Sequence, residues 1–159
     1  MTTKNLLTLK SLHLTDDPAN LLSRDKGAKK AKMPLVRIAL LEGKPPAYLQ
    51  KISDSVHRAL VETISVPPQD RFQLITEHKR SQFIYDPAYL NIARTDNLVI
   101  VQITLSQGRT LEAIKSLYKR MVELLVQEAN LRPEDVFINL VEVAKENWSF
   151  GNGVAQYAT

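Results

Sequence analysis

Two rhythms of apolar and polar residues follow one another from residue 34 onward. Residues 34–43, PLVRIALLEG, are an apolar run that ends at a glycine, which is typical of a strand. Residues 45–65 begin with two prolines, which favour the start of a helix. Apolar residues then recur every three or four positions, at Leu49, Ile52, Val56, Leu60 and Ile64. VPPQD (66–70) indicates a turn and RFQLITEH (71–78) a second strand, so the order is strand, helix, strand.

The same pattern recurs 65 residues later without a gap. Val36, Ile38 and Leu40 correspond to Val101, Ile103 and Leu105, and Gly43-Lys44 corresponds to Gly108-Arg109. VPPQDRF (66–72) corresponds to LRPEDVF (131–137), with Pro, Asp and Phe in register. Two unrelated strand-helix-strand units would also share a similar apolar pattern, because the same periodicity rules apply to both. Matching turn residues at a single offset, however, favour a duplication. The sequence therefore predicts two β-α-β units, at residues 34–77 and 99–142.

This duplication predicts an α+β fold, a four-stranded mixed sheet with two helices on one face. Each strand-helix-strand crossover should be right-handed. Strands such as LVIVQITL (98–105) are apolar on both sides, as doubly covered strands are. Because two helices cover one face only, the other face has to meet something, and we expect a neighbouring subunit in a homotrimer.

Three segments lie outside the two units. Residues 1–33 form a basic, polar leader without a sustained period, for which we expect weak order, and 34–159 form the domain. Residues 79–97 have many Asp, Asn and Pro residues and indicate a loop with a short strand or turn. Residues 144–159 contain the only tryptophan and two turn glycines, and we expect a C-terminal hairpin that reaches a neighbouring subunit.

Composition narrows the class of protein. A chain of 159 residues is long enough for one domain with a real core. The chain has no cysteine, which excludes disulfides and thiolate metal sites. No apolar run approaches the roughly 20 residues of a membrane span, and the N-terminus lacks a continuous apolar signal segment. We therefore expect a cytoplasmic protein without a membrane partner.

The net charge of +4 belongs to the leader. Residues 1–33 hold seven Lys or Arg and three Asp, while the remainder has 14 basic and 14 acidic residues. A domain without net charge attracts the phosphate backbone of nucleic acids only weakly, so we expect no nucleic-acid partner. If the leader did bind nucleic acid, binding would be strongly salt-dependent and lost on deletion of residues 1–32.

Three stretches carry a resemblance to a known family. VPPQDRFQ (66–73), SQGRTLEAIKSLY (106–118) and NWSFGNGVAQY (147–157) resemble the malonate semialdehyde decarboxylase branch of the tautomerase superfamily. Tandem β-α-β units that begin with a proline resemble this superfamily as a whole, whose members use an amino-terminal proline. The resemblance runs from Pro34 to the C-terminus. One decarboxylase branch has two arginines where this chain has Gln107 and Arg109, so the one-arginine variant is the closer comparison.

The resemblance implies that Pro34 is catalytic as a free secondary amine. Burial among apolar groups lowers the pKa of such an amine, so that it can act as a general base. Beside a carboxylate it stays cationic and polarises a substrate carbonyl. We interpret Met33 as the initiator methionine, and residues 1–32 as an upstream misreading, an added segment or a removable leader. In an intact chain Pro34 has no basic nitrogen, and a plain strand-edge proline remains the alternative.

The resemblance also implies further site residues. Asp70 would hold the Pro34 ammonium or orient water, although its repeat mate Asp135 shows that the position also suits a turn residue. Arg109 would bind a substrate carboxylate, with a solvated arginine before a helix as the alternative. Trp148 and Phe150 would form an apolar wall or pack at an interface. Gln73 is a further substrate-binding candidate, and Arg71 is expected to pair with Asp70.

The resemblance implies a cofactor-free enzyme acting on small oxo acids. Three histidines without paired spacing make a metal site improbable, and no glycine-rich phosphate loop is present. Decarboxylation of malonate semialdehyde is the preferred activity, and a general keto–enol tautomerase of the phenylpyruvate type is the nearer alternative. If residues 1–33 are retained, the prediction becomes a non-catalytic trimeric scaffold.

Overall fold

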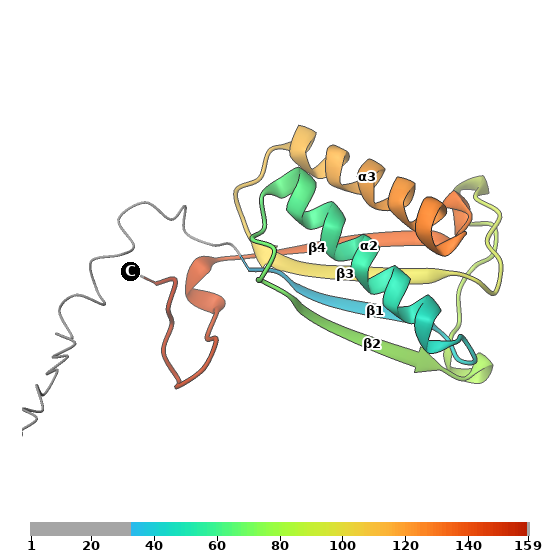
Figure 1. The fold of residues 1–159 in the computed structure, drawn as a ribbon, viewed down its shortest axis with the longest axis horizontal. Coiled ribbons are helices and arrows are strands. Elements are labelled where there is room, and N and C mark those ends of the chain that lie inside the picture. Colours follow the sequence, from blue (N-terminus) through green and yellow to red (C-terminus); the bar gives the residue numbers. More distant parts are fainter. Residues whose placement is uncertain (1–32, 159) are drawn as a thin grey trace, which may run out of the picture. The chain divides into compact units, whose positions relative to one another are not determined.

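The computed structural model describes residues 33–158 and contains the predicted strands and helices in the predicted order (Figure 1). The first unit comprises β1 (Leu35–Leu41), α2 (Pro46–Ile64) and β2 (Phe72–His78). The second comprises β3 (Val99–Ser106), α3 (Leu111–Ala129) and β4 (Val136–Val143). The α+β class and the tandem β-α-β pattern are confirmed. Residues 1–32, for which weak order was predicted, lie outside the described residues.

The four strands form one mixed sheet in the order β2-β1-β3-β4. β1 is parallel to β2, with Leu35 opposite Phe72, and β3 is parallel to β4, with Ser106 opposite Val143. The two units join through the antiparallel pair β1–β3, in which Leu35 lies opposite Thr104. The start of the first unit therefore lies beside the end of β3, more than 60 residues away in the chain.

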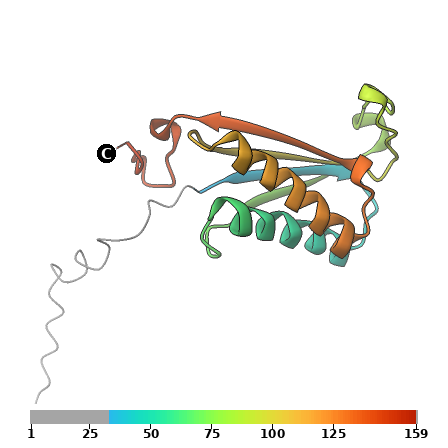
Figure 2. The same ribbon diagram turned by 90° about the horizontal axis from the view of Figure 1, so that it is seen from above.

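Both helices lie on the same face of the sheet, as predicted (Figure 2). Alternate residues of β1 and β3 point toward them and are almost fully buried, since a strand presents every second side chain to one face. The core also takes the apolar stripe of each helix. Its central members are Val36, Ile38, Leu40, Ile52, Val56, Leu60, Val101, Ile103, Leu105, Leu117, Met121 and Leu125.

The duplication extends to the ends of the elements. α2 and α3 each have 19 residues and begin and end 65 residues apart. Ser65 and Asn130 end the two helices in the left-handed conformation, with φ of 57° and 54°. Gly43 and Gly108 follow β1 and β3 with φ of 96° and 107°, a region that glycine enters without strain. Residues that lie 65 positions apart in the sequence thus also have similar backbone conformations.

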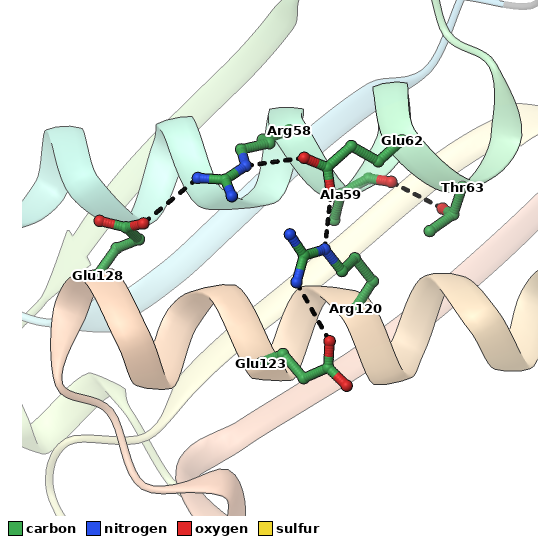
Figure 3. Close-up of polar contacts among 7 residues, drawn as sticks. All are labelled: Arg58, Ala59, Glu62, Thr63, Arg120, Glu123 and Glu128. Carbon is green, nitrogen blue, oxygen red and sulfur yellow. Dashed lines mark hydrogen bonds and ion pairs between the residues drawn. The ribbon is translucent and has the colours of Figure 1, made fainter.

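Ion pairs connect the two helices on the side away from the sheet (Figure 3). Glu62 of α2 accepts hydrogen bonds from Arg58, one turn earlier, at 2.8 Å and from Arg120 of α3 at 2.6 Å. Arg58 also reaches Glu128, and Arg120 reaches Glu123. All these side chains are at least 30% exposed, so solvent screens the pairs and their contribution to stability is small. The apolar core between the helices and the sheet supplies most of the stability.

The opposite face of the sheet carries exposed apolar side chains. Phe72 and Leu74 of β2 are 55% and 53% exposed, and Phe137 and Val141 of β4 are 44% and 36% exposed. Their strand positions alternate with those that face the helices. An apolar sheet face of this kind is typical of a surface that another molecule covers.

The predicted C-terminal hairpin is wrong. Among residues 144–158 the structure has a short 3-10 helix, Lys145–Asn147, and turns, without a strand. Gly151, Asn152 and Gly153 all have positive φ, which coils the chain where a hairpin would need extended backbone on both sides. Aromatic rings hold the segment instead: Phe150 stacks on Trp148 at 5.4 Å between ring centroids and contacts Tyr157 at 4.7 Å.

The connection between the two units, residues 79–97, contains two 3-10 turns, Arg80–Gln82 and Tyr89–Asn91, and no strand. The expectation of a loop with turns is therefore confirmed for this segment. None of the helices in the described part of the chain is long and apolar enough to cross a membrane.

Candidate active site

The strand pairing brings four chain positions to one end of the sheet. β1 and β2 begin at this end, and β3 and β4 finish there, at the left in Figure 1. Pro34 directly precedes β1, Asp70 lies two residues before β2, and Arg109 lies three residues beyond β3. The segment with Trp148 follows β4. We call this region the Pro34 end, and the opposite end of the sheet the Lys44 end.

A pocket of about 220 Å³ opens at the Pro34 end. We call it the Pro34 pocket, and its lining residues are Met33, Pro34, Leu35, Phe72, Trp148, Ser149 and Phe150. Pro34 itself is buried. The predicted catalytic proline and the predicted aromatic wall therefore do meet. Except for Ser149, the side chains of this lining are apolar or aromatic, an environment that disfavours a charged group.

Asp70 ends the turn before β2, where its backbone N–H donates to the carbonyl of Pro67 at 2.9 Å. Its Oδ2 atom is buried and has no hydrogen-bond partner among the described residues. A buried carboxylate oxygen is strongly unfavourable unless a donor or a cation satisfies it. Since Asp70 precedes Phe72, the strand partner of Leu35, its carboxylate lies at the same end of the sheet as Pro34.

Arg109 is partly buried on the loop between β3 and α3. Its guanidinium donates to the carbonyl of Ser106 at 2.5 Å, which holds the side chain back toward the end of β3. Burial lowers the pKa of Arg109, and the negative charge of Glu142 opposes that shift. The group remains a cation near neutral pH, because an arginine pKa starts far above that range. No described carboxylate lies within ion-pair distance, so its paired N–H donors are available to an anion.

Gln73 is not among the residues that line the Pro34 pocket. Its position lies opposite Val36, on the face that the helices cover. Its amide donates to the backbone carbonyl of Ser53 at 3.1 Å and its oxygen accepts from the Ser53 hydroxyl. In the structure this side chain thus connects β2 to α2, and its role in binding substrate stays a prediction.

Arg71 does not pair with Asp70, so that expectation is wrong. Its guanidinium lies 2.7 Å from the carboxylate of Asp54 on α2 and also donates to Ser53. The physical reason is the alternation along the extended chain, which turns consecutive side chains to opposite sides. Asp70 is left without this arginine.

Four pocket residues were not predicted as site residues: Met33, Leu35, Phe72 and Ser149. Phe72 and Leu35 are strand partners that face the pocket side of the sheet, and the shared Phe of VPPQDRF and LRPEDVF was a signal for Phe72. Ser149 had no signal in the sequence. Tyr157 lies close by, since its hydroxyl accepts a hydrogen bond from the backbone N–H of Met33 at 3.3 Å.

The sheet pairing and the pocket can be compared with known proteins. A family model described as tautomerase enzyme matches residues 70–151, and a second of the same description matches residues 34–91. The probable tautomerase YusQ of Bacillus subtilis (strain 168) is 45% identical over 124 residues, which is 78% of this chain and 98% of that protein. The probable tautomerase YrdN of the same organism is 37% identical over 80% of this chain and 98% of that protein. The chain belongs to the tautomerase family.

Solved structures agree with this assignment. FG41 malonate semialdehyde decarboxylase inhibited by 3-bromopropiolate is 37% identical, with a TM-score of 0.72 over 77% of this chain and 93% of that one. A second malonate semialdehyde decarboxylase is 28% identical with the same TM-score, over 77% and 95% of the two chains. A fused 4-OT described as a symmetric trimer, 21% identical, has a TM-score of 0.64 over 78% of this chain and 98% of that one, and shows the shared fold.

Proposed function

We propose that this protein is a cofactor-free enzyme that uses the amine of Pro34 on small oxo acids, with decarboxylation of malonate semialdehyde as the preferred activity. One observation carries the proposal: the pairing of β1 with β2 and β3 brings Pro34, Asp70 and Arg109 to the same end of the sheet, next to an aromatic pocket. Similarity to two malonate semialdehyde decarboxylases at 28% and 37% identity supports the choice of substrate.

Each group has a role in this reaction. Arg109 holds the substrate carboxylate through its paired N–H donors. Pro34, kept cationic by Asp70, donates a hydrogen bond to the substrate carbonyl oxygen. The bond to the carboxylate carbon then breaks and carbon dioxide leaves. The electron pair of that bond moves toward the carbonyl, whose oxygen takes the Pro34 proton, and the enol is later protonated at carbon. The rings of Trp148 and Phe150 exclude water and so strengthen these interactions.

The second candidate is a general keto–enol tautomerase of the phenylpyruvate type. The names of the two Bacillus subtilis relatives, probable tautomerases at 45% and 37% identity, favour it. In this reaction Pro34 acts as a neutral base that takes a proton from the carbon next to the carbonyl. An apolar pocket that lowers the amine pKa suits this role.

Both activities require that the working protein begins at Pro34. One family model starts to match at residue 34, which supports this. Met33 lines the Pro34 pocket in the intact chain, so its removal would both free the Pro34 nitrogen and enlarge the pocket. Should the native protein retain residues 1–33, the non-catalytic scaffold becomes the better proposal.

A homotrimer is part of the proposal. The exposed apolar face formed by Phe72, Leu74, Phe137 and Val141 supports it, because subunit packing would remove this surface from water. A Leu74→Asp variant should dissociate into smaller species in sedimentation experiments. A monomer in the unmodified protein would contradict this part of the proposal.

Mass spectrometry of the protein from its native host tests the requirement for a free amine. We expect a mass that begins at Pro34, and a mass that begins at Met1 would remove the catalytic proposal. Assays of the processed protein with malonate semialdehyde and with phenylpyruvate then separate the two activities. Pro34→Ala and Arg109→Ala should both lose rate, whereas equal rates in all three proteins would remove the site assignment.

A further inference from the structure

A second pocket, of about 360 Å³, lies at the Lys44 end. It forms where β1 leads into α2 and where α3 ends, so it is built from both units. Its lining residues are Lys44, Pro45, Tyr48, Asn97, Ala129, Asn130, Leu131 and Arg132. None of them lines the Pro34 pocket. We call it the Lys44 pocket.

The duplication relates this pocket to the active-site end. Lys44 follows Gly43 after β1 as Arg109 follows Gly108 after β3, and both glycines have positive φ. The two cations are therefore delivered by the same backbone turn. Arg109 is the proposed carboxylate-binding residue of the first site, so the fold supplies an equivalent cation to the second.

Lys44 has unused capacity to bind an anion. Its ammonium donates one hydrogen bond, to the side-chain oxygen of Asn97 at 2.7 Å, and lies 5.8 Å from the centre of the Tyr48 ring. An ammonium has three donors, so two remain. Within residues 33–158 no carboxylate pairs with it. Arg132 is the second cation of the lining, held by the carbonyl of Ala93 at 3.2 Å.

The polar groups around these cations suit a small organic acid. Arg132 is partly neutralised by Glu134 at 3.5 Å and by Asp135 at 3.9 Å, which leaves Lys44 as the main cation. Burial and then the charge of Asp135 raise the pKa of Tyr48, so its phenol stays protonated and can donate. Pro45 and Leu131 add apolar walls, which favour a carbon skeleton over a purely inorganic ion.

The Lys44 end cannot repeat the proposed chemistry. Val99 stands at the repeat position of Pro34, in mid-chain and without an ionisable nitrogen. Asp135 stands at the position of Asp70, but its two oxygens accept from the backbone N–H and the hydroxyl of Thr95 at 2.6 and 2.8 Å. The described lining of the Lys44 pocket contains neither a proline amine nor a carboxylate, so a bound ligand would not react.

We propose that the Lys44 pocket is a second, non-catalytic binding site for a small organic carboxylate, held by Lys44 with support from Tyr48 and Arg132. This site goes beyond the proposed activity and does not require that Pro34 be free. Its occupant belongs to the same chemical class as the proposed substrate, because the repeat places equivalent cations at both ends of the sheet.

Calorimetric titration of sodium malonate into the Arg109→Gln variant of the full chain tests the proposal. We expect one malonate per chain, and binding weaker by about tenfold or more when Lys44→Gln is added. Addition of Lys115→Gln, which removes an exposed lysine of α3, should leave the affinity unchanged. Lack of malonate binding in Arg109→Gln, or equal binding with Lys44→Gln and Lys115→Gln, would overturn the site.

Two further measurements locate the ligand and identify its class. Trp148 is the only tryptophan and lines the Pro34 pocket, so its fluorescence should not change while Arg109→Gln binds malonate. A fluorescence change that follows the calorimetric curve would place the binding at the first pocket and contradict the proposal. Titration with inorganic phosphate at matched ionic strength should show weaker binding, and affinity equal to that of malonate would overturn selectivity for an organic carboxylate.

Discussion

The two ends of the sheet are formed by equivalent elements of the two units, and they differ in two side chains and in the surroundings of an aspartate that both have. The Pro34 end has a proline before its strand, an arginine, and an aspartate with a buried oxygen that has no partner within residues 33–158. The Lys44 end has Val99, a lysine, and the fully buried Asp135 with both oxygens bound. The duplication supplied equivalent positions at both ends, and the proposed chemistry depends on the groups around them.

Thr95 shows how this difference arises. It lies four residues before Val99, and its backbone N–H and hydroxyl donate hydrogen bonds to the two oxygens of Asp135. The segment that leads into the second unit therefore supplies the donors that this carboxylate requires. The corresponding chain of the first unit precedes Pro34. If the working protein begins at Pro34, that chain is absent and Asp70 is left to hold the proline ammonium. Processing would then create both the amine and the carboxylate environment that it needs.

The largest effect should separate Pro34 from its repeat mate Val99. In protein that begins at Pro34, Pro34→Ala should lower kcat by about 100-fold or more, since acid–base groups contribute at least that much. Val99→Ala should keep kcat but lower the free energy of unfolding by about 2 kcal/mol, because it opens a cavity in the core. Steady-state kinetics and urea denaturation measure the two. Comparable loss of kcat in both variants would refute the assignment.

The next comparison is between Arg109 and Lys44. Arg109→Ala should lower kcat/KM by about 10- to 100-fold, the value of a charge-assisted hydrogen bond to substrate. Lys44→Ala should leave kcat/KM unchanged, because this lysine lies at the other end of the sheet. Steady-state kinetics with malonate semialdehyde or phenylpyruvate, whichever is the better substrate, measures both values of kcat/KM. A greater loss for Lys44→Ala would reverse the roles of the two ends.

Replacing Asp70 and Asp135 by Asn should affect different properties of the protein, activity in the first case and stability in the second. Asp70→Asn should lower activity by about tenfold while stability stays close to that of the wild type. Asp135→Asn should lower the free energy of unfolding by about 1–3 kcal/mol, because Thr95 then faces a weaker acceptor in a buried site. Paired activity and urea-denaturation measurements check this. Equal stabilities for the two variants would show that the aspartates are equivalent after all.

The smallest effect concerns Glu62, whose repeat mate is Gln127. Hydrogen bonds from Arg120 and then Arg58 lower the pKa of Glu62. A carboxyl whose pKa is lower in the folded protein stabilises the fold above its unfolded pKa, and this contribution is lost as the pH falls through the folded value. Glu62→Gln should therefore lower the melting temperature at pH 7 and reduce its fall toward acid pH.

Glu77→Gln is the control for this last prediction, because Glu77 is exposed and forms no ion pair with a described residue. High salt should shrink the difference between Glu62→Gln and the wild type, since exposed charges are screened. Identical acid melting curves for wild type and Glu62→Gln would show that the ion pairs between the helices contribute nothing measurable.

Much of the fold could be predicted because its signals are local. Strand and helix periods, paired prolines and the turn glycines Gly43 and Gly108 located the elements and the 65-residue repeat. The C-terminal segment was mispredicted because its glycines were compatible with both a hairpin turn and a coil. The sequence did not indicate that the register would place Gln73 on the helix side of β2, where it bonds Ser53, and its role in binding substrate stays a prediction.

The sequence by itself determined the duplicated strand-helix-strand order and the residue types available for chemistry, because burial of apolar residues and turn conformation depend on near neighbours. Only the tertiary structure decided which residues meet. The antiparallel pairing of β1 with β3 brings Pro34 and Arg109 to one end of the sheet across a long stretch of chain. Packing likewise distinguishes two aspartates at equivalent positions. Thr95 donates to both oxygens of Asp135, while one oxygen of Asp70 has no hydrogen-bond partner among the described residues.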